Sequence, residues 1–498
     1  MHRPAWWLLA LLVLMAFAFQ GTRGLWEPDE GRYTATGINM LKSGDWLVPT
    51  VDGERPHLTK PPITYWAIAA SIGALGYHEW AARLPGALAF VGTGLLVFGL
   101  GRRFCPARPW LPAVVWALSL APLIGANIVS TDALLVFFET AAMYAFVEAW
   151  LREPAERRRW LLAMWLCWGL AFMTKGPPGL LPLAAAVAFL AIHDRSRLRG
   201  VFLPAGLLLF AVTAFTWFGF IVFQQPDRLG YFLGHEVVDR VFTARHDRNA
   251  QWYGAFRIYL PVLLLGALPW SVMALAAAGG PMAAWRKLRT RVRERHPQTL
   301  LLLYWFLLPL TVFFIARSRL ELYVLPLFVP LALIIARPLA TWTWLDRRRF
   351  AVSAAATAVA LLALKGVAAH VTTDRDASRM ADQIRHAVDL HGIDEIAFFD
   401  MKAFFGLTLY LDVRVESVRM DEPGHAHSRF LPSAEHLCHE LSEPEARVFA
   451  LKRGDVGHFS TAVTACGPHQ AVEIGSFHGD GLDVVLFRVQ PGARVTVG

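Results

Sequence analysis

Three charged residues in one short loop are the first candidates for chemistry in this 498-residue chain. Asp29, Glu30 and Arg32 lie in the stretch LWEPDEGRY, directly after an apolar N-terminal segment. A carboxylate can act as a general base or orient a hydroxyl group, and a guanidinium can bind a phosphate through two parallel hydrogen bonds. Charged groups at a membrane boundary are costly, so this group of residues predicts a site in the loop.

Further acids and bases follow at the ends of apolar runs. Lys60 lies in LTKPP, Asp132 in NIVSTDALL and Lys175 in MTKGPPG, and the segment 224–257 contributes Glu236 and Arg240. Any one of them could instead be a solvated charge that anchors the end of a helix. This alternative is weaker for Asp29, Asp132 and Lys175 taken together, because each lies close against an apolar run.

Glycosyl transfer from a lipid phosphate would use these groups together. Cations would stabilise the departing phosphate, and carboxylates would orient or deprotonate the acceptor. Since the leaving group is already a phosphate, such an enzyme needs no nucleotide-binding domain. The sequence contains neither a G-x-G-x-x-G fingerprint nor a P-loop, which agrees with a donor carried by a lipid.

The elements that must position these residues are membrane spans, because 55% of the chain is hydrophobic and only 17% is charged. Long apolar runs recur at 6–19, 84–100, 110–126, 133–150, 160–173, 178–192, 201–223, 258–278, 299–316, 322–336 and 350–369. Most can cross a bilayer core as a helix, so we expect a mainly α, polytopic bundle with about 11 and at most about 13 spans. We expect the first run to be an uncleaved anchor, the alternative being a signal peptide.

The net charge of +9 follows the expected topology of the chain. Short loops between the spans hold the arginines, around residues 102–108, 152–159, 195–199, 286–295 and 337–349. With the spans above they all fall on one side, which the positive-inside rule makes cytoplasmic. We therefore expect no nucleic-acid binding, and we place the candidate residues on the opposite, outer side.

Two outer regions are longer than a simple connection. Residues 20–83 form the first outer loop, in which 61–77 is apolar and helical in pattern. We expect this helix either at the membrane interface or packed against the bundle. Residues 371–498 hold no spanning run and alternate helical patterns with strand-like runs such as IAFFD and LDVVLFRV. We expect a membrane domain at 1–370 and a small soluble α/β domain at 371–498, where Cys438 and Cys466 either form a disulfide or stay reduced.

The first outer loop resembles that of GT-C membrane glycosyltransferases, in particular bacterial aminoarabinose (lipid A) transferases and protein O-mannosyltransferases. The likeness rests on EPDEGRYTATGINMLKSGDWLVPTVDGERPHLTKPPITYW, where an acid pair and Arg precede G-D-W and then K-P-P. The later segments STDALL, TKGPPG, GALPW and SRLELYVLPLF are similar to the same group, so the likeness covers residues 20–340.

This resemblance implies a role for each matching residue. It implies that Asp29 and Asp132 are catalytic, that Arg32, Lys60 and Lys175 bind the donor phosphate, and that Glu30, Tyr323, Glu236 and Arg240 bind substrate. It further implies a polyprenyl-phosphate-linked sugar as the donor, and lipid A or another extracytoplasmic acceptor. The enzyme would lie in the bacterial inner membrane, with the site and the C-terminal domain facing the periplasm.

One departure from the family pattern concerns metals. Aminoarabinose transferases commonly have Glu directly before K-P-P, and that Glu can contribute to a metal site, whereas this chain has Thr59. We therefore expect no required cofactor or metal ion, although a divalent metal is compatible with the site. The sugar and the acceptor stay open, with transfer to protein or polysaccharide hydroxyls as the alternative. A transporter or flippase is a further one, although transporters usually place polar residues at the bilayer midplane.

Overall fold

The computed structural model describes residues 4–232, 249, 251–420 and 435–491. Its contacts divide the chain into two compact units. The helical unit comprises Met1–Ala18, Thr59–Thr64 and Arg83–Val367, and the mixed unit comprises Phe19–Leu58, Tyr65–Ala82 and Ala368–Gly498. Each unit is described by itself.

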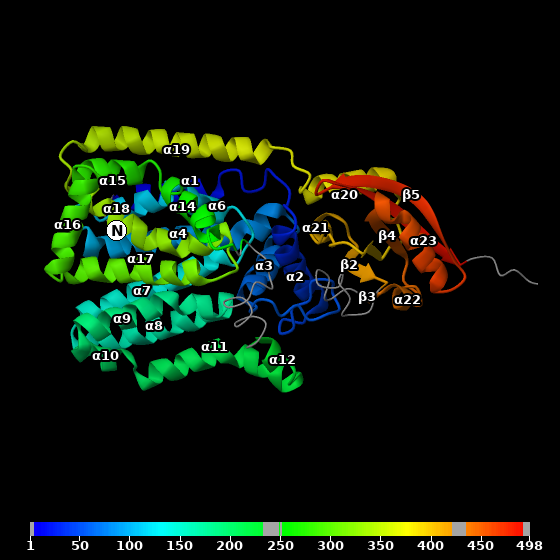
Figure 1. Cartoon of the computed structure of the whole chain (residues 1–498), viewed down its shortest axis with the longest axis horizontal. Coiled ribbons are helices and arrows are strands. Elements are labelled where there is room, and N and C mark those ends of the chain that lie inside the picture. Colours follow the sequence, from blue (N-terminus) through cyan, green and yellow to red (C-terminus); the bar gives the residue numbers. More distant parts are fainter. Residues whose placement is uncertain (1–3, 233–248, 250, 421–434, 492–498) are drawn as a thin grey trace, which may run out of the picture. The chain divides into compact units, whose positions relative to one another are not determined.

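The helical unit is built from helices alone in the residues described (Figure 1). They are α1 (Pro4–Phe17), α4 (Glu79–Phe104), α5 (Leu111–Ala117), α6 (Leu120–Ala126), α7 (Asp132–Leu151), α8 (Pro154–Lys175), η1 (Pro177–Leu180), α9 (Leu181–His193), α10 (Arg195–Val201), α11 (Pro204–Gln224), α12 (Arg228–Gly230), α14 (Gly254–Leu265), α15 (Trp270–Ala278), α16 (Pro281–Arg293), α17 (Pro297–Ile315), η3 (Glu321–Leu327), α18 (Phe328–Thr341) and α19 (Arg347–His370).

Helical structure occupies most of each apolar run, which confirms the expected polytopic helical class. Within the described residues, six helices are long and apolar enough to cross a membrane, and a seventh span results if α14 and α15, bent by 76°, count as one. The remaining runs are shorter apolar helices or, like α5 and α6, are interrupted. The chain is a multi-span membrane protein.

The N-terminal helix α1 is part of the helical unit's core. Leu8, Leu12 and Met15 are almost fully buried. The Lys365 side chain on α19 donates hydrogen bonds of 3.0 Å to the carbonyl oxygens of Met15 and Ala16, which have no intrahelical partner at the end of a helix. Whether this helix is a retained anchor stays a prediction.

In its described residues, the C-terminal part of the mixed unit contains a six-stranded sheet with the order β3-β2-β1-β4-β6-β5. The strands are β1 (Glu395–Phe399), β2 (Arg414–Arg419), β3 (Glu435–His436), β4 (Arg447–Lys452), β5 (His469–Gly479) and β6 (Leu482–Pro491). The first four strands run parallel, and the β5–β6 hairpin adds antiparallel to β4. The fully buried β1 at the centre is typical of a parallel sheet covered on both faces.

Helices cover the two faces of this sheet. They are α20 (Ala377–Ala387), α21 (Leu407–Tyr410), α22 (Leu437–Glu440), η5 (Arg453–Asp455) and α23 (Val456–Ala465). Successive residues of β1 alternate between two cores, with Ile396 and Phe398 in one and Ala397 and Phe399 in the other. The expected α/β character of the C-terminal region is confirmed. Cys438 and Cys466 form a disulfide, with Cα atoms 4.9 Å apart.

Two helices of the segment 20–83 belong mainly to this same mixed unit, namely α2 (Asp29–Ser43) and α3 (Ile63–Leu75). Helix α2 packs against α21, and Gly37 of α2 lies so close to α3 that an added Cβ would be 2.7 Å from Ile68. Most of the first loop therefore clusters with residues 368–498. The expected division into domains 1–370 and 371–498, drawn from membrane topology, stays a prediction.

Candidate functional site

Three of the predicted residues come together inside the helical unit. Asp132 is the first residue of α7 and Lys175 is the last residue of α8, so the antiparallel packing of these two helices brings the side chains together. The Lys175 ammonium forms an ion pair with Asp132 and lies 4.6 Å from the ring centroid of Tyr323 in η3. We call these three residues the helical group.

The TKGPPG motif explains why α8 ends at Lys175. Gly176 has a φ of +73°, a conformation that favours glycine, and Pro177 cannot continue the hydrogen bonding of the helix. An acid at the start of α7 and a base at the end of α8 each complement the local helix dipole. The sequence thus fixes both the position of the pair and its polarity.

The helical group is largely shielded from solvent. The side chains of Lys175 and Asp132 are 10% and 9% exposed, so this is a buried ion pair. Glu139 lies two turns further along α7, is 3% exposed and interacts electrostatically with both members of the pair. Our sequence analysis did not select Glu139, although an acid inside an apolar run, seven residues after Asp132, is the signal that could have found it.

Asp29 and Arg32 form a second group, at the start of α2 in the mixed unit. Their side chains form an ion pair of 2.5 Å and are 56% and 29% exposed. Burial disfavours the charged form of Arg32, but Tyr33, Asp29 and Tyr65 outweigh this effect and raise the pKa of the guanidinium above its usual value. Arg32 is therefore a permanent cation beside a more exposed carboxylate, and we call this pair the loop group.

Glu30 lies next to the loop group but has other contacts. It is 2% exposed, forms an ion pair with Arg23 and accepts a hydrogen bond of 2.9 Å from the backbone N–H of Trp26. Arg23 also lies 4.1 Å from the ring centroid of Trp26. These contacts fix the turn that leads into α2. The predicted substrate-binding role of Glu30 stays a prediction.

The remaining predicted residues are Lys60, Glu236 and Arg240. Lys60 lies in the short segment Thr59–Thr64 of the helical unit and donates a hydrogen bond of 2.7 Å to the carbonyl oxygen of Thr59. Glu236 and Arg240 lie outside the described residues. Their roles, like those of the two groups above, remain predictions.

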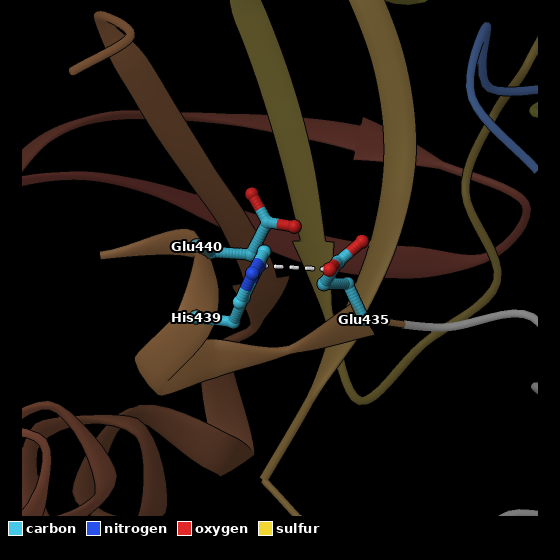
Figure 2. A group of neighbouring side chains, drawn as sticks. All are labelled: Glu435, His439 and Glu440. Carbon is cyan, nitrogen blue, oxygen red and sulfur yellow. Dashed lines mark ion pairs between the residues drawn. The ribbon is translucent and has the colours of Figure 1, made fainter. Parts of the chain in front are cut away.

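Among the residues described, two sets of side chains have the ligand types and spacing of a metal site, and both lie in the C-terminal part of the mixed unit. Figure 2 shows the first, in which His439 and Glu440 of α22 face Glu435 of β3. The His439 ring is already paired with Glu435 at 2.9 Å, and Glu440 with Arg447 at 3.0 Å. The candidate metal ligands of this set therefore already have partners within the protein.

The second set consists of Glu395, Glu416 and Glu440, all buried. Arg447 forms ion pairs with Glu395 at 2.8 Å and with Glu440. Burial, and then the neighbouring Glu395 charge, raises the pKa of the Glu416 carboxyl, which favours its protonated form. The expectation that no metal is required stays a prediction.

Comparisons with known proteins show that this chain is similar to several glycosyltransferases. The family described as dolichyl-phosphate-mannose-protein mannosyltransferase matches residues 59–220. The undecaprenyl phosphate-alpha-4-amino-4-deoxy-L-arabinose arabinosyl transferase 2 of Sodalis glossinidius is 33% identical over 340 residues, which is 67% of this chain and 58% of that protein. The corresponding transferase 1 of the same organism is 37% identical over 324 residues, 63% of this chain and 55% of that protein.

A solved structure shares the fold over nearly the whole length. The crystal structure of ArnT from Cupriavidus metallidurans bound to undecaprenyl phosphate has a TM-score of 0.75 and 20% identity, and covers 97% of this chain and 98% of that chain. The matched part nevertheless spans only 58% of the first curated relative. These similarities confirm the resemblance to bacterial aminoarabinose transferases and the expected fold class.

Proposed function

We propose that this protein is an integral-membrane glycosyltransferase that moves a sugar from a polyprenyl-phosphate donor to an extracytoplasmic acceptor. The observation that carries the proposal is the 33% identity to an enzyme named for an undecaprenyl-phosphate aminoarabinose donor. The proposed sugar is 4-amino-4-deoxy-L-arabinose, and the proposed acceptor is a lipid A phosphate. We place the reaction at the periplasmic face of the bacterial inner membrane, since the arginine-rich loops predict the cytoplasmic side.

In the proposed reaction the acceptor oxygen attacks the anomeric carbon of the sugar. A new carbon–oxygen bond forms as the bond to the phosphate oxygen breaks, and its electron pair leaves with the polyprenyl phosphate. One displacement of this kind inverts the anomeric centre. Arg32, Lys60 and Lys175 would stabilise the developing charge on the phosphate, because charge-assisted hydrogen bonds are the strongest available.

The role proposed for Asp29 depends on the acceptor. A hydroxyl acceptor must lose its proton, which the exposed Asp29 carboxylate would accept. A phosphate acceptor is already ionised, so Asp29 would only position it. Asp132 is proposed to hold Lys175 in its charged form, and Tyr323 to keep the Lys175 ammonium in place through its ring.

The test is a transfer assay with the full-length protein purified in lipid. Polyprenyl-phosphate aminoarabinose and lipid A are supplied, and the wild type is compared with Asp29→Ala and Lys60→Ala. We expect transfer by the wild type, also in the presence of a metal chelator, and loss of transfer in both variants without loss of folded protein. Absence of transfer by the wild type would remove the lipid A assignment.

A second acceptor class has an observation of its own. The family match at residues 59–220 carries the description of a protein mannosyltransferase. Wild-type protein that fails with lipid A but glycosylates a serine- or threonine-rich peptide from a polyprenyl-phosphate sugar would support that class. Failure with all donors and acceptors would favour a transporter, which a flip assay with a labelled polyprenyl-phosphate sugar in vesicles would then test.

A further inference from the structure

The segment that leads into the loop group is tied to the C-terminal chain by backbone hydrogen bonds. Within the mixed unit, the N–H of Glu27 donates to the carbonyl oxygen of Arg375 at 2.9 Å, and the N–H of Ala377 donates to that of Leu25 at 2.9 Å. The N–H of Leu25 also donates to the hydroxyl of Tyr410, at 2.9 Å. A distant part of the chain therefore sets the backbone two to four residues before Asp29.

The Glu27 side chain is the centre of this connection. It is 3% exposed, and its Oε1 accepts a hydrogen bond from the backbone N–H of Gly406, directly before α21. Its Oε2 is buried and has no hydrogen-bond partner among the described residues. Glu27 thus connects two segments that are more than 300 residues apart in sequence. Burying a carboxyl group costs free energy, and one hydrogen bond offsets only part of that cost.

Two glycines show how closely the segments approach. A Cβ on Gly31 would lie 2.4 Å from Glu27 Oε1 and 2.5 Å from the Gly406 nitrogen. A Cβ on Gly406 would lie 2.7 Å from Glu27 Oε1 and 3.3 Å from the Cα of Gly31. The first turn of α2 and the chain before α21 thus meet backbone to backbone around the Glu27 carboxyl, with no room for another side chain.

We propose that Glu27 is a positioning residue through which the C-terminal domain fixes the first turn of α2, and with it the orientation of Asp29 and Arg32. The proposal rests on the proposed function, since it assigns the C-terminal domain a part in the transfer reaction. Asp29 and Arg32 are one turn from the Glu27 contact, and small displacements of reacting groups are expensive in rate. Glu27 itself touches no reacting atom.

The connection also responds to pH. Burial raises the pKa of Glu27 to about 8, which the Gly406 N–H and Arg32 partly oppose. The other charged groups facing Glu27 are Asp480 in the turn between β5 and β6 and Glu30 in the first turn of α2, and both favour the protonated form. Glu27 is therefore neutral at neutral pH, and it acquires an unfavourable buried charge as the pH rises through about 8.

The experiment compares Glu27→Gln, Glu27→Ala and the matched control Asp412→Asn in the full-length protein in lipid bilayers. Gln keeps an acceptor for the Gly406 N–H and does not ionise, whereas Ala removes the acceptor. Asp412→Asn breaks an exposed ion pair with Lys42 between the same two parts of the chain. Two readouts are recorded from pH 6.5 to 9, the transfer kinetics and the hydrogen–deuterium exchange of peptides covering residues 25–43.

We expect Glu27→Ala to lower kcat by about 10-fold or more, with KM for the donor changed less, and to raise exchange in α2. Glu27→Gln should retain most of the neutral-pH rate and lose the decline that the wild type shows above pH 8. Asp412→Asn should leave both readouts within about twofold of the wild type.

Wild-type exchange rates in α2 for Glu27→Ala would overturn the proposal, and so would the same decline above pH 8 in Glu27→Gln as in the wild type. If no variant or wild type transfers sugar, the proposed function fails, yet the exchange data still decide whether Glu27 positions α2. A Glu27→Ala protein that does not fold shifts the decision to the pH dependence of Glu27→Gln.

Discussion

The two groups of candidate residues use similar chemistry in opposite surroundings. Each pairs an aspartate at the start of a helix with a cation, Asp132 with Lys175 and Asp29 with Arg32. The first pair is 9% and 10% exposed, and the second is 56% and 29% exposed. A buried pair must keep its partners to avoid an isolated charge, whereas an exposed pair can exchange partners with an incoming ligand. We infer that the helical group holds a fixed charge arrangement and that the loop group responds to substrate.

The largest effect should follow from breaking the buried pair. Lys175→Ala leaves the Asp132 carboxylate without its cation, and we expect a loss of about 3–5 kcal/mol of stability together with loss of transfer. The measurement is thermal unfolding in detergent, followed by the transfer assay. The double variant Asp132→Leu/Lys175→Met should recover much of the stability without recovering activity. Equal stability of Lys175→Ala and the wild type would contradict a buried pair.

Removing the disulfide should affect the unit that holds the loop group. Cys438 and Cys466 are 28 residues apart in sequence, and closing a loop of that size contributes about 3.5 kcal/mol in the chain-entropy model. We expect Cys438→Ser/Cys466→Ser to lower the unfolding midpoint of the C-terminal part of the mixed unit. Limited proteolysis of that part is the measurement. Cys105→Ser serves as the control, because Cys105 is a free thiol. An unchanged proteolysis pattern would show that the disulfide adds little.

A smaller effect is expected in the pH dependence of stability, through Glu27 in the mixed unit. The pKa of Glu27 is raised from 4.5 to about 8, so its contribution to stability is fully present below pH 4.5 and is lost as the pH rises through 8. Between these values the Glu27 contribution should fall by at most about 1.4 kcal/mol per pH unit. The measurement compares the unfolding midpoints of the wild type and Glu27→Gln at pH 6, 7 and 8. Parallel midpoints would mean that Glu27 is not buried as described.

The smallest change in stability should come from the exposed pair. We expect Asp29→Asn to change stability by less than about 1 kcal/mol, because exposed ion pairs contribute little. The same variant should lower the transfer rate by about 100-fold or more if Asp29 acts as a base. Thermal unfolding and the transfer assay together give the contrast with Lys175→Ala. A large loss of stability in Asp29→Asn would remove the distinction between the two groups.

The sequence predicted most of the secondary structure for clear physical reasons. Apolar runs long enough for a membrane became helices, and the alternating strand-like runs in the C-terminal region became β1, β2, β4, β5 and β6. The short strand β3 and the helix α23 were not expected, because a two-residue pairing has no period and α23 is interrupted by small polar residues. The disulfide was left open, since spacing alone cannot show that two cysteines are close.

The site was less accessible to sequence reasoning. The motifs indicated that Asp132 and Lys175 lie at the ends of apolar helices. Only the fold shows that the two side chains form an ion pair with each other. The sequence does not indicate a role for Glu27, because that role depends on a contact with Gly406. Contacts between residues so far apart in sequence leave no local pattern from which they could be predicted.

The mixed unit combines segments from the two ends of the chain, so its parts are synthesised at different times. Its first segments end at Ala82, and its next segment begins at Ala368. At about 5–20 residues per second, synthesis of the roughly 300 residues between them takes on the order of 15–60 s. During that time the helix bearing Asp29 and Arg32 is already translated while Arg375, Gly406 and Tyr410 do not yet exist. Nascent chains therefore pass through a stage in which most of the helical unit is translated and the mixed unit is still incomplete.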